Sequence, residues 1–350
     1  MAQIKRNNHF VPQFYLKQWS EDGNRIWLYR ILVSHECVPE WKLQSTRGIA
    51  YHSDLYTTMV DGHEIDEFEQ WIEAEYETPA QEALNKVIRN EPLKSEDWNR
   101  LAMFLAAQDV RTPTSYLESM KRWESNLPEI LDSTLKESVR RLEQAHKEGQ
   151  PIQPTSNDPA FFKNVIKVQV KPNAEPQKGK GLIRAEMIVG RDLWLESQRF
   201  LLSKTAKALL NHKWSIVEPA KGNEWFTCDH PVIRLNYYGD GTYDLNGGWG
   251  NQGANLIMPL SPHHLLFTQI RSESPDRFTF SEEITSKMQG FVAERALRFI
   301  YAFNPIDNIS LLRPRFVDSE AVKYEEGQWR KWHNEQSSAV GNKTYHSDEN

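Results

Sequence analysis

Polar residues interrupt the apolar stripes of three predicted helices in this chain of 350 residues. Each lies three, four or seven positions from large apolar residues, so it faces the same side as they do. These inward polar residues are Glu75, Gln108, Arg111 and Arg295. Burying an amide or a charge without a partner is costly, so these side chains must meet partners. They form either a structural network of ion pairs between helices or the lining of a functional site.

Two further residues carry groups that titrate. His9 precedes a short helix expected to begin at Pro12, where free backbone N–H groups and the helix dipole favour an anion. Asp229 ends a predicted strand and enters a turn fixed by Pro231, from which a carboxylate projects over a sheet edge. The alternative is an Asx-turn, in which Asp229 only accepts backbone hydrogen bonds. His230, next in the turn, is expected to point elsewhere.

A histidine beside a carboxylate, an amide and an arginine forms an acid–base set with an anion stabiliser. We expect this set to consist of His9, Asp229, Gln108 and Arg111. His9 would move the proton, Asp229 would orient it or bind a divalent metal, and Arg111 would hold a phosphate. The residues expected to bind ligand around this set are Glu75, Tyr15 and Arg295.

This pattern predicts a hydrolase of a phosphate-bearing substrate, namely a nuclease-like effector that acts on RNA or DNA. The alternative is a binding protein without catalysis. Its polar cluster would hold a small anionic ligand, a nucleotide for example, or would only lock the N-terminal segment onto the helices. The sequence leaves open whether the protein is an enzyme, which cofactor or metal it takes, and its oligomeric state.

Several familiar motifs are not met. The Gly-rich segment 239–255 lacks the Lys-Ser/Thr of a phosphate-binding loop, which favours a mobile loop or lid. The histidines show no HExxH spacing, and no Gly-x-Ser-x-Gly elbow occurs. The two cysteines, Cys37 and Cys228, match no metal-binding or catalytic signature.

Composition narrows the class of protein further. The formal net charge of -6 gives no broad basic surface, so any contact with nucleic acid must be local. No apolar run reaches the length of a membrane span and no signal peptide is recognised, which predicts no membrane contact. With only two cysteines, the chain is predicted to be cytoplasmic.

The elements that must position these residues indicate an α+β fold. We expect a helical body, a small N-terminal β-sheet and a C-terminal antiparallel β-sheet. The strands at 25–31 and 54–60 are expected to pair with each other in the N-terminal sheet. Residues 1–325 are predicted to form a single globular domain, in which 64–212 is the helical middle and 213–305 the β-rich part. A polar tail is expected at 326–350.

Four segments resemble the signatures of a bacterial family known as domain of unknown function 4238. "HFVPQFYLKQW" is similar to its His-Tyr-Val-Pro start, and "AAQDVRTP" to its Gln-x-x-Arg-Thr-Pro element. "FTCDHPVI" resembles its Thr-Ser-Asp-Asn-Pro turn, and "IMPLSP" its Pro-Leu-Ser-Pro strand. The segments occur in family order and cover the chain from about His9 to Phe303.

The resemblance implies a set of important positions. They are His9, Pro12, Tyr15, Gln108, Arg111, Thr112, Pro113, Asp229, Pro231 and Pro259. The chain departs from the family pattern at Phe10, Cys228 and His230, so a hydroxyl at position 228 has no role here. The family name implies no activity. The setting of such genes among mobile elements suggests a role in phage defence or as a toxin.

Overall fold

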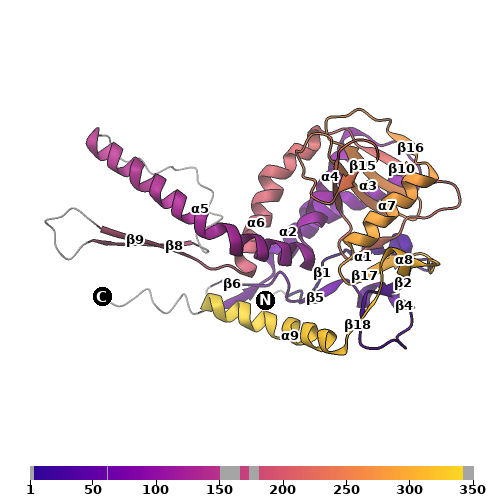
Figure 1. Ribbon diagram of the computed structural model, residues 1–350, viewed down its shortest axis with the longest axis horizontal. Helices are drawn as coiled ribbons and strands as arrows, with labels where there is room; N and C mark the ends of the chain where they lie inside the picture. Colours follow the sequence, from indigo (N-terminus) through magenta and orange to yellow (C-terminus); the bar gives the residue numbers. More distant parts are fainter. Residues whose placement is uncertain (1–3, 61, 150–165, 173–180, 342–350) are drawn as a thin grey trace. The chain divides into compact units, whose positions relative to one another are not determined.

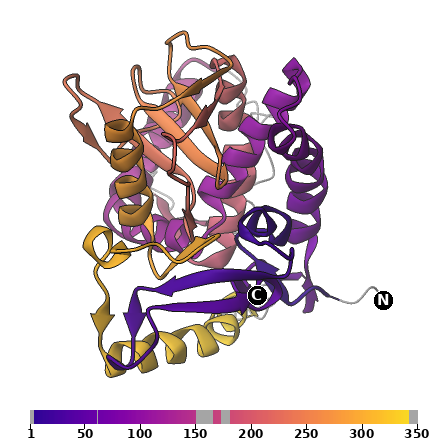
Figure 2. The ribbon, with the colours of Figure 1, turned by 90° about the vertical axis from the view of Figure 1, so that its right-hand side faces the viewer.

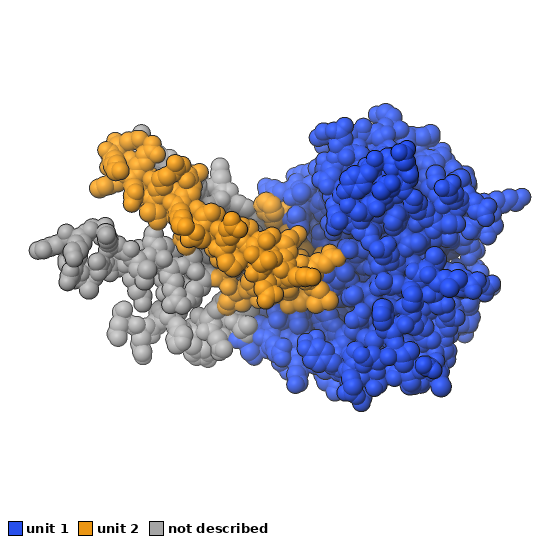
Figure 3. All heavy atoms as spheres, viewed as in Figure 1, with its two compact units in different colours: residues 1–114, 201–350 blue, residues 115–200 orange. Residues whose placement is uncertain are grey.

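The structure is a computed structural model, which describes residues 4–60, 62–149, 166–172 and 181–341. Helices and largely antiparallel sheets occupy different stretches of the chain, which confirms the α+β class (Figure 1). The chain divides into two compact units, residues 1–114 with 201–350 and residues 115–200 (Figure 3). The expected single domain is therefore interrupted by an inserted unit, since residues 115–200 make most of their contacts among themselves.

The N-terminal segment forms a short strand followed by a short helix. Strand β1 (Asn7–His9) pairs antiparallel with β5 (Tyr51–Ser53). Pro12 is the N-cap of α1 (Gln13–Leu16), which continues as the 3₁₀ turn η1 (Lys17–Trp19). The predicted apolar face is confirmed, because the side chains of Tyr15, Leu16 and Trp19 are fully buried.

A four-stranded sheet joins the two ends of the chain. Its order is β11 (Thr227–Cys228), β17 (Phe299–Ala302), β2 (Arg25–Arg30) and β4 (Trp41–Ser45). The expected pairing of the strands at 25–31 and 54–60 is wrong. Instead, β6 (Thr58–Val60) pairs with β7 (His63–Ile65), and β2 pairs with β17. The sequence also predicts a last helix from about Glu282 to Phe303, but residues 299–302 are a strand because aromatic and β-branched residues favour a sheet.

The helices between residues 67 and 110 carry two of the predicted site residues, Glu75 and Gln108. Their bounds are α2 (Glu67–Ile72), the π-helical turn η3 (Glu73–Glu77), α3 (Thr78–Ile88) and α4 (Ser95–Val110). The N-cap of α4 is Lys94 rather than the expected Ser95, and the Lys94 N–H donates to the Asp97 carboxylate.

A six-stranded sheet forms the C-terminal core. Its order is β13 (Tyr243–Asp244), β12 (Ile233–Tyr237), β14 (Asn255–Ser261), β15 (His264–Gln269), β10 (Ser215–Glu218) and β16 (Arg277–Thr279). Every pairing is antiparallel except that of β10 with β16. Helix α7 (Glu282–Arg295) packs Met288 and Val292 onto this sheet (Figure 2).

The remaining elements complete the two units. The second unit contains α5 (Pro113–Lys147), the hairpin of β8 (Ile166–Pro172) and β9 (Gly181–Met187), and α6 (Arg191–Phe200). In the first unit lie the 3₁₀ segment η2 (Thr46–Gly48), the π turn η6 (Leu201–Thr205) and the 3₁₀ segment η7 (Ala206–Asn211). The spacing of apolar residues predicts one helix from about Asp192 to His212, which is instead divided among α6, η6 and η7. The first unit also holds β3 (Leu32–Val33), β18 (Phe316–Val317), α8 (Ile309–Leu312) and α9 (Ser319–Gly341). The sequence also predicts a short helix between the loops at 149–159 and 171–181. Residues 160–165 lie outside the described residues, and residues 166–170 belong to strand β8 instead.

The C-terminal segment differs from the expected polar tail. Residues 326–341 continue α9, whose Trp332 is buried. An aromatic ring every few residues lets a polar helix pack one side against the protein. No helix in the described ranges is long and apolar enough to cross a membrane.

Candidate functional site

Arg111 lies at the C-terminal end of α4 and holds the N-terminal segment in place. Its guanidinium donates to the backbone oxygen of His9 and to the carboxylate of Glu77, and its Nε lies 3.3 Å from the Tyr56 hydroxyl. The side chain is fully buried. Burial alone would lower the pKa of Arg111, but the charges of Glu77 and its neighbours outweigh it and raise the pKa. The three nitrogens of the guanidinium are thus all engaged within the protein.

The partner of Arg111 is Glu77 and not Glu75, which is solvent-exposed. The expectation followed α-helical spacing from Ile72, but the chain forms the π turn η3 here. Pro79 has no N–H, and its ring would clash with the carbonyl of Glu75 in a regular α-helix. The π turn accommodates Pro79 and shifts the inward face toward the C-terminus.

Gln108 and Tyr15 also hold the N-terminal segment against the rest of the protein. Gln108 Nε2 donates to the backbone oxygen of Phe10 at 2.7 Å. The Tyr15 hydroxyl lies 2.7 Å from Thr227 Oγ1 and donates to the Pro259 oxygen at 2.6 Å. All these contacts go to the protein itself, which supports the alternative in which the polar cluster locks this segment.

The imidazole of His9 lies beside these contacts. Its Nε2 is 2.9 Å from Gln13 Nε2, and its ring lies 5.6 Å from that of Tyr51. Burial first, and then the charges of Arg111 and Lys5, lower the pKa of His9 to about 4. His9 is therefore neutral near pH 7, where it can accept a proton only weakly.

The lowered pKa of His9 predicts a pH dependence of stability. The unfolded chain takes up a proton near pH 6.5, while folded His9 does so only near pH 4. The stability that the folded protein gains from neutral His9 is complete above about pH 6.5 and is lost as the pH falls toward 4. We expect denaturant titrations between pH 6.5 and 4 to show a smaller loss of unfolding free energy for His9→Gln than for wild type. His63→Gln, at an exposed histidine, is the control, and equal losses in all three proteins would contradict the assignment.

The carboxylate of Asp229 bonds a backbone turn and not the residues of this cluster. Its carboxylate accepts backbone N–H groups from Leu297 at 2.8 Å, Arg298 at 2.7 Å and Phe299 at 3.2 Å. Burial raises the pKa of Asp229 to about 6, and the three N–H donors oppose this rise. Across the described part of the chain, the carboxylate forms no hydrogen bond with His9, Gln108 or Arg111. Asp229 thus fixes the turn between α7 and β17.

His230 lies at the centre of a second polar cluster, contrary to expectation. The ring is fully buried, with Nδ1 2.5 Å from Thr112 Oγ1 and Nε2 2.5 Å from Arg295 Nη2. Burial and the nearby arginines lower the pKa of His230 well below its ordinary value. The neutral ring accepts from Arg295 and donates from Nδ1 to Thr112. The sequence gives no signal for the direction of the His230 side chain, because a residue in a turn has no periodicity.

Asp109 belongs to the same cluster. Its Oδ1 lies 4.0 Å from His230 Nε2, and its Oδ2 accepts from Trp249 Nε1 at 2.8 Å and lies 3.5 Å from Arg234 Nη1. Trp249 comes from the Gly-rich segment expected to be a mobile loop or lid. Gly247 in this segment runs so close to β12 that an added Cβ would lie 2.6 Å from the Leu235 nitrogen. The segment is therefore held against the body at these points.

The described residues show no group of three or more His, Cys, Asp or Glu side chains arranged to hold a metal ion. Asp229, which was expected to orient the proton or bind a divalent metal, therefore belongs to no such group among these residues. Both cysteines are free thiols, and burial raises the pKa of Cys228, which makes it a poor nucleophile.

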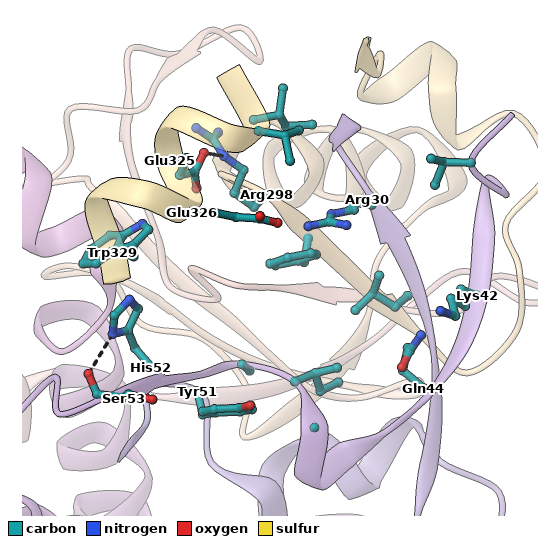
Figure 4. Close-up of a pocket in the computed structure, with 18 of the residues that line it drawn as sticks. Arg30, Lys42, Gln44, Tyr51, His52, Ser53, Arg298, Glu325, Glu326 and Trp329 are labelled. Atoms are coloured by element: carbon teal, nitrogen blue, oxygen red, sulfur yellow. Dashed lines mark hydrogen bonds and ion pairs between the residues drawn. The ribbon is translucent and has the colours of Figure 1, made fainter. Parts of the chain in front are cut away.

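A cavity of about 1250 Å³ lies at a different place in the first unit (Figure 4). Its walls are strands β2, β4 and β5 on one side and helix α9 on the other. Aromatic and basic side chains share the lining, including Tyr51, His52, Trp329, Arg30, Lys42 and Arg298. None of the seven predicted site residues lines this cavity.

The sequence contains two of the basic residues of this cavity, Arg30 and Lys42, on neighbouring strands. A loop separates these strands, and its length does not determine the register that brings the two residues together. The other wall is α9, much of which falls in the segment where the sequence predicts a polar tail. The sequence therefore gives no indication that Trp329 lines a cavity. The N-terminal segment still contributes indirectly, because His9 pairs with Tyr51 in the β1–β5 ladder.

Comparisons with known proteins agree with the motifs. No curated protein and no solved structure matches the chain. The model of one family, described as "Protein of unknown function (DUF4238)", matches residues 7–305. The match spans the N-terminal segment, α4, the turn at Asp229 and strand β14, the four places where the sequence resembles the family. Because it also covers most of the chain, the protein belongs to the DUF4238 family.

Proposed function

We propose that the protein binds a nucleoside phosphate, either a free nucleotide or part of a nucleic-acid chain, in the cavity between the N-terminal strands and α9. One observation carries this proposal: two cations, Arg30 and Lys42, lie there beside aromatic rings and have no acidic partner among the described residues. Within the described ranges, Arg30 and Lys42 form no ion pair, and Arg30 lies 5.8 Å from the Phe299 ring centre.

The two kinds of side chain match the two parts of such a ligand. Arginine and lysine hold phosphate groups through charge-assisted hydrogen bonds. Aromatic side chains provide a face on which a base stacks, and this works for any base. A cavity of about 1250 Å³ has room for a nucleotide. Local recognition of this type is compatible with a formal net charge of -6, which gives no broad basic surface.

The contacts of the four residues predicted to be catalytic favour a structural role for them over a role in hydrolysis. The donors of Arg111 serve the N-terminal segment, and the carboxylate of Asp229 serves a backbone turn. Gln108 bonds the backbone of Phe10. These contacts favour the structural lock as the role of this cluster and leave the cavity as the place for a ligand.

A hydrolase that uses the cavity is the second candidate, and one observation favours it. Two imidazoles, His52 and His333, line the cavity, and His333 Nε2 lies 3.0 Å from a carboxylate oxygen of Glu64. Burial lowers the pKa of His52, which keeps it neutral and able to accept a proton. A nuclease-like effector in phage defence, or a cytoplasmic toxin, would be a hydrolase of this kind.

The test is a binding titration of the purified protein. Fluorescence anisotropy with labelled ATP, single-stranded RNA and single-stranded DNA distinguishes a free nucleotide from a polymer. We expect Arg30→Ala and Lys42→Ala each to weaken binding about tenfold, the loss typical of one hydrogen bond between charged groups. Binding should also weaken as salt is added.

Arg25→Ala is the matched control, because Arg25 lies at the other end of β2 and outside the cavity lining. Unchanged affinity in both cavity variants would show that the ligand binds elsewhere. The same incubations, with and without divalent metal and analysed for products, test the hydrolase. Conversion of substrate that His52→Ala abolishes would establish it.

A further inference from the structure

Three carboxylates line the cavity, and they differ in what balances their charge. Glu325 pairs with Arg298 at 2.6 Å, and Asp54 pairs with Arg6 at 2.9 Å. Glu326 forms no ion pair within the described part of the chain, although it also lines the cavity. An unbalanced carboxylate beside a phosphate site would weaken the binding of phosphate alone. Glu326 is solvent-exposed, so water hydrates it in the free protein, and a ligand bound here would have to offer hydrogen-bond donors in place of that water.

Helix α9 presents Glu326 and Trp329 on the same side. Residues three apart are neighbours on a helix surface, and they are displaced by about 4.5 Å along its axis. In Figure 4, Glu326 projects from α9 toward Arg30 across the cavity, while Trp329 lies beside His52 at the other end. The Trp329 and His52 ring centres are 4.3 Å apart. The aromatic platform, the carboxylate and the cation thus follow one another along the cavity.

Contacts to the body hold this helix over the cavity. Arg298 binds Glu325, and His333 binds Glu64 at 3.0 Å. Trp332 is buried on the side of α9 that faces the protein. Both ion pairs lie within two helical turns of Glu326, so its backbone position is well defined.

We infer that Glu326 recognises the ribose of the bound nucleotide by accepting hydrogen bonds from its two hydroxyl groups. This inference rests on the proposed function. The order base, ribose and phosphate in a nucleotide corresponds to the order of Trp329, Glu326 and Arg30. A ribose offers two adjacent hydroxyl donors, and a carboxylate accepts both through its two oxygens. The ligand is therefore a free ribonucleotide or the 3′-terminal residue of an RNA, because the 3′-oxygen of an internal RNA residue is esterified and cannot donate. A deoxyribonucleotide, which lacks one of the two hydroxyls, binds less well.

Amino groups on the base are the other donors that a nucleotide offers. ATP and dATP carry the same base and the same phosphates, so a comparison of the two isolates the ribose. Pyrophosphate carries only the phosphates, and it reports on the cation end of the cavity. Isothermal titration with these three probes therefore separates the parts of the proposed site.

We expect wild-type protein to bind ATP about tenfold more tightly than dATP, as one charge-assisted hydrogen bond provides. Glu326→Ala should bring this ratio close to one and bind pyrophosphate at least as well as wild type, because a repulsive charge is removed. Glu326→Gln keeps the shape and should show an intermediate ratio. Glu320→Gln, on the same helix but outside the cavity lining, should behave as wild type.

The outcomes separate this inference from the proposed function. Equal affinity of the wild type for ATP and dATP would overturn ribose recognition while leaving nucleotide binding intact. A ratio that survives in Glu326→Ala would assign recognition to another residue and overturn the role of Glu326. No binding of any nucleotide or of RNA would overturn both. Melting temperatures of the variants within a degree or two of wild type verify that each protein is folded.

Discussion

Replacing Arg111 by lysine lowers the free energy of unfolding by about 3 kcal/mol or more, the cost of breaking a buried ion pair. Lysine keeps the charge but cannot reach Glu77, the His9 carbonyl and Tyr56 from one planar group. The side chain is fully buried, so water cannot replace the lost partners. Denaturant unfolding and the melting temperature measure the effect.

The acidic partner provides a matched pair of variants. Glu77→Gln should destabilise the protein strongly, whereas Glu75→Gln, two residues away and exposed, should leave its stability nearly unchanged. If Glu77→Gln leaves the stability unchanged, the phosphate-binding role predicted for Arg111 is favoured instead. In that case Arg111→Lys would keep its melting temperature and lose affinity for phosphate or oligonucleotide.

Replacing Tyr15 by alanine lowers the free energy of unfolding by about 3–5 kcal/mol, as large-to-small changes in a packed core do. The ring is fully buried and lies 5.0 Å from the ring of Trp19 and 6.0 Å from that of Phe104. Its hydroxyl ties α1 to β11 and β14 through Thr227 and Pro259. Losing the ring therefore leaves a cavity and unpaired oxygen atoms together.

Tyr15→Phe separates these two effects. It keeps the ring and removes only the hydroxyl, so we expect a loss of about 1–2 kcal/mol. Tyr324→Ala, at a side chain that is 69% exposed on α9, is the control and should change stability little. If Tyr15→Ala unfolds at nearly the wild-type denaturant concentration, the N-terminal segment is not part of the cooperative core.

The polar contacts that hold the N-terminal segment are connected to the cavity through one strand pair, β1 with β5. β1 carries His9 and ends at the segment that Arg111 and Gln108 hold, and its partner β5 carries Tyr51 and His52 into the cavity wall. A firmly held N-terminal segment therefore positions one wall of the proposed ligand site.

The sequence by itself determined the local elements and the residues that face inward on regular helices. The buried face of α1 follows from the spacing of Tyr15, Leu16 and Trp19. The burial of Gln108 and Arg111 follows from their place on the apolar stripe of α4. A C-terminal antiparallel sheet was also predicted, since apolar runs between turn residues mark its strands β12, β14 and β15.

Only the tertiary structure decided which polar groups meet. Glu77 replaces Glu75 because a π turn before Pro79 breaks the helical period on which the prediction depended. His230 lies in a turn, where no period indicates direction, and only the approach of α4 and α7 gives it Thr112 and Arg295 as partners. The cavity needs β2, β5 and α9 together, and these segments are far apart in sequence. Periodicity reports the side of an element that is buried, whereas long-range packing alone determines what that side contacts.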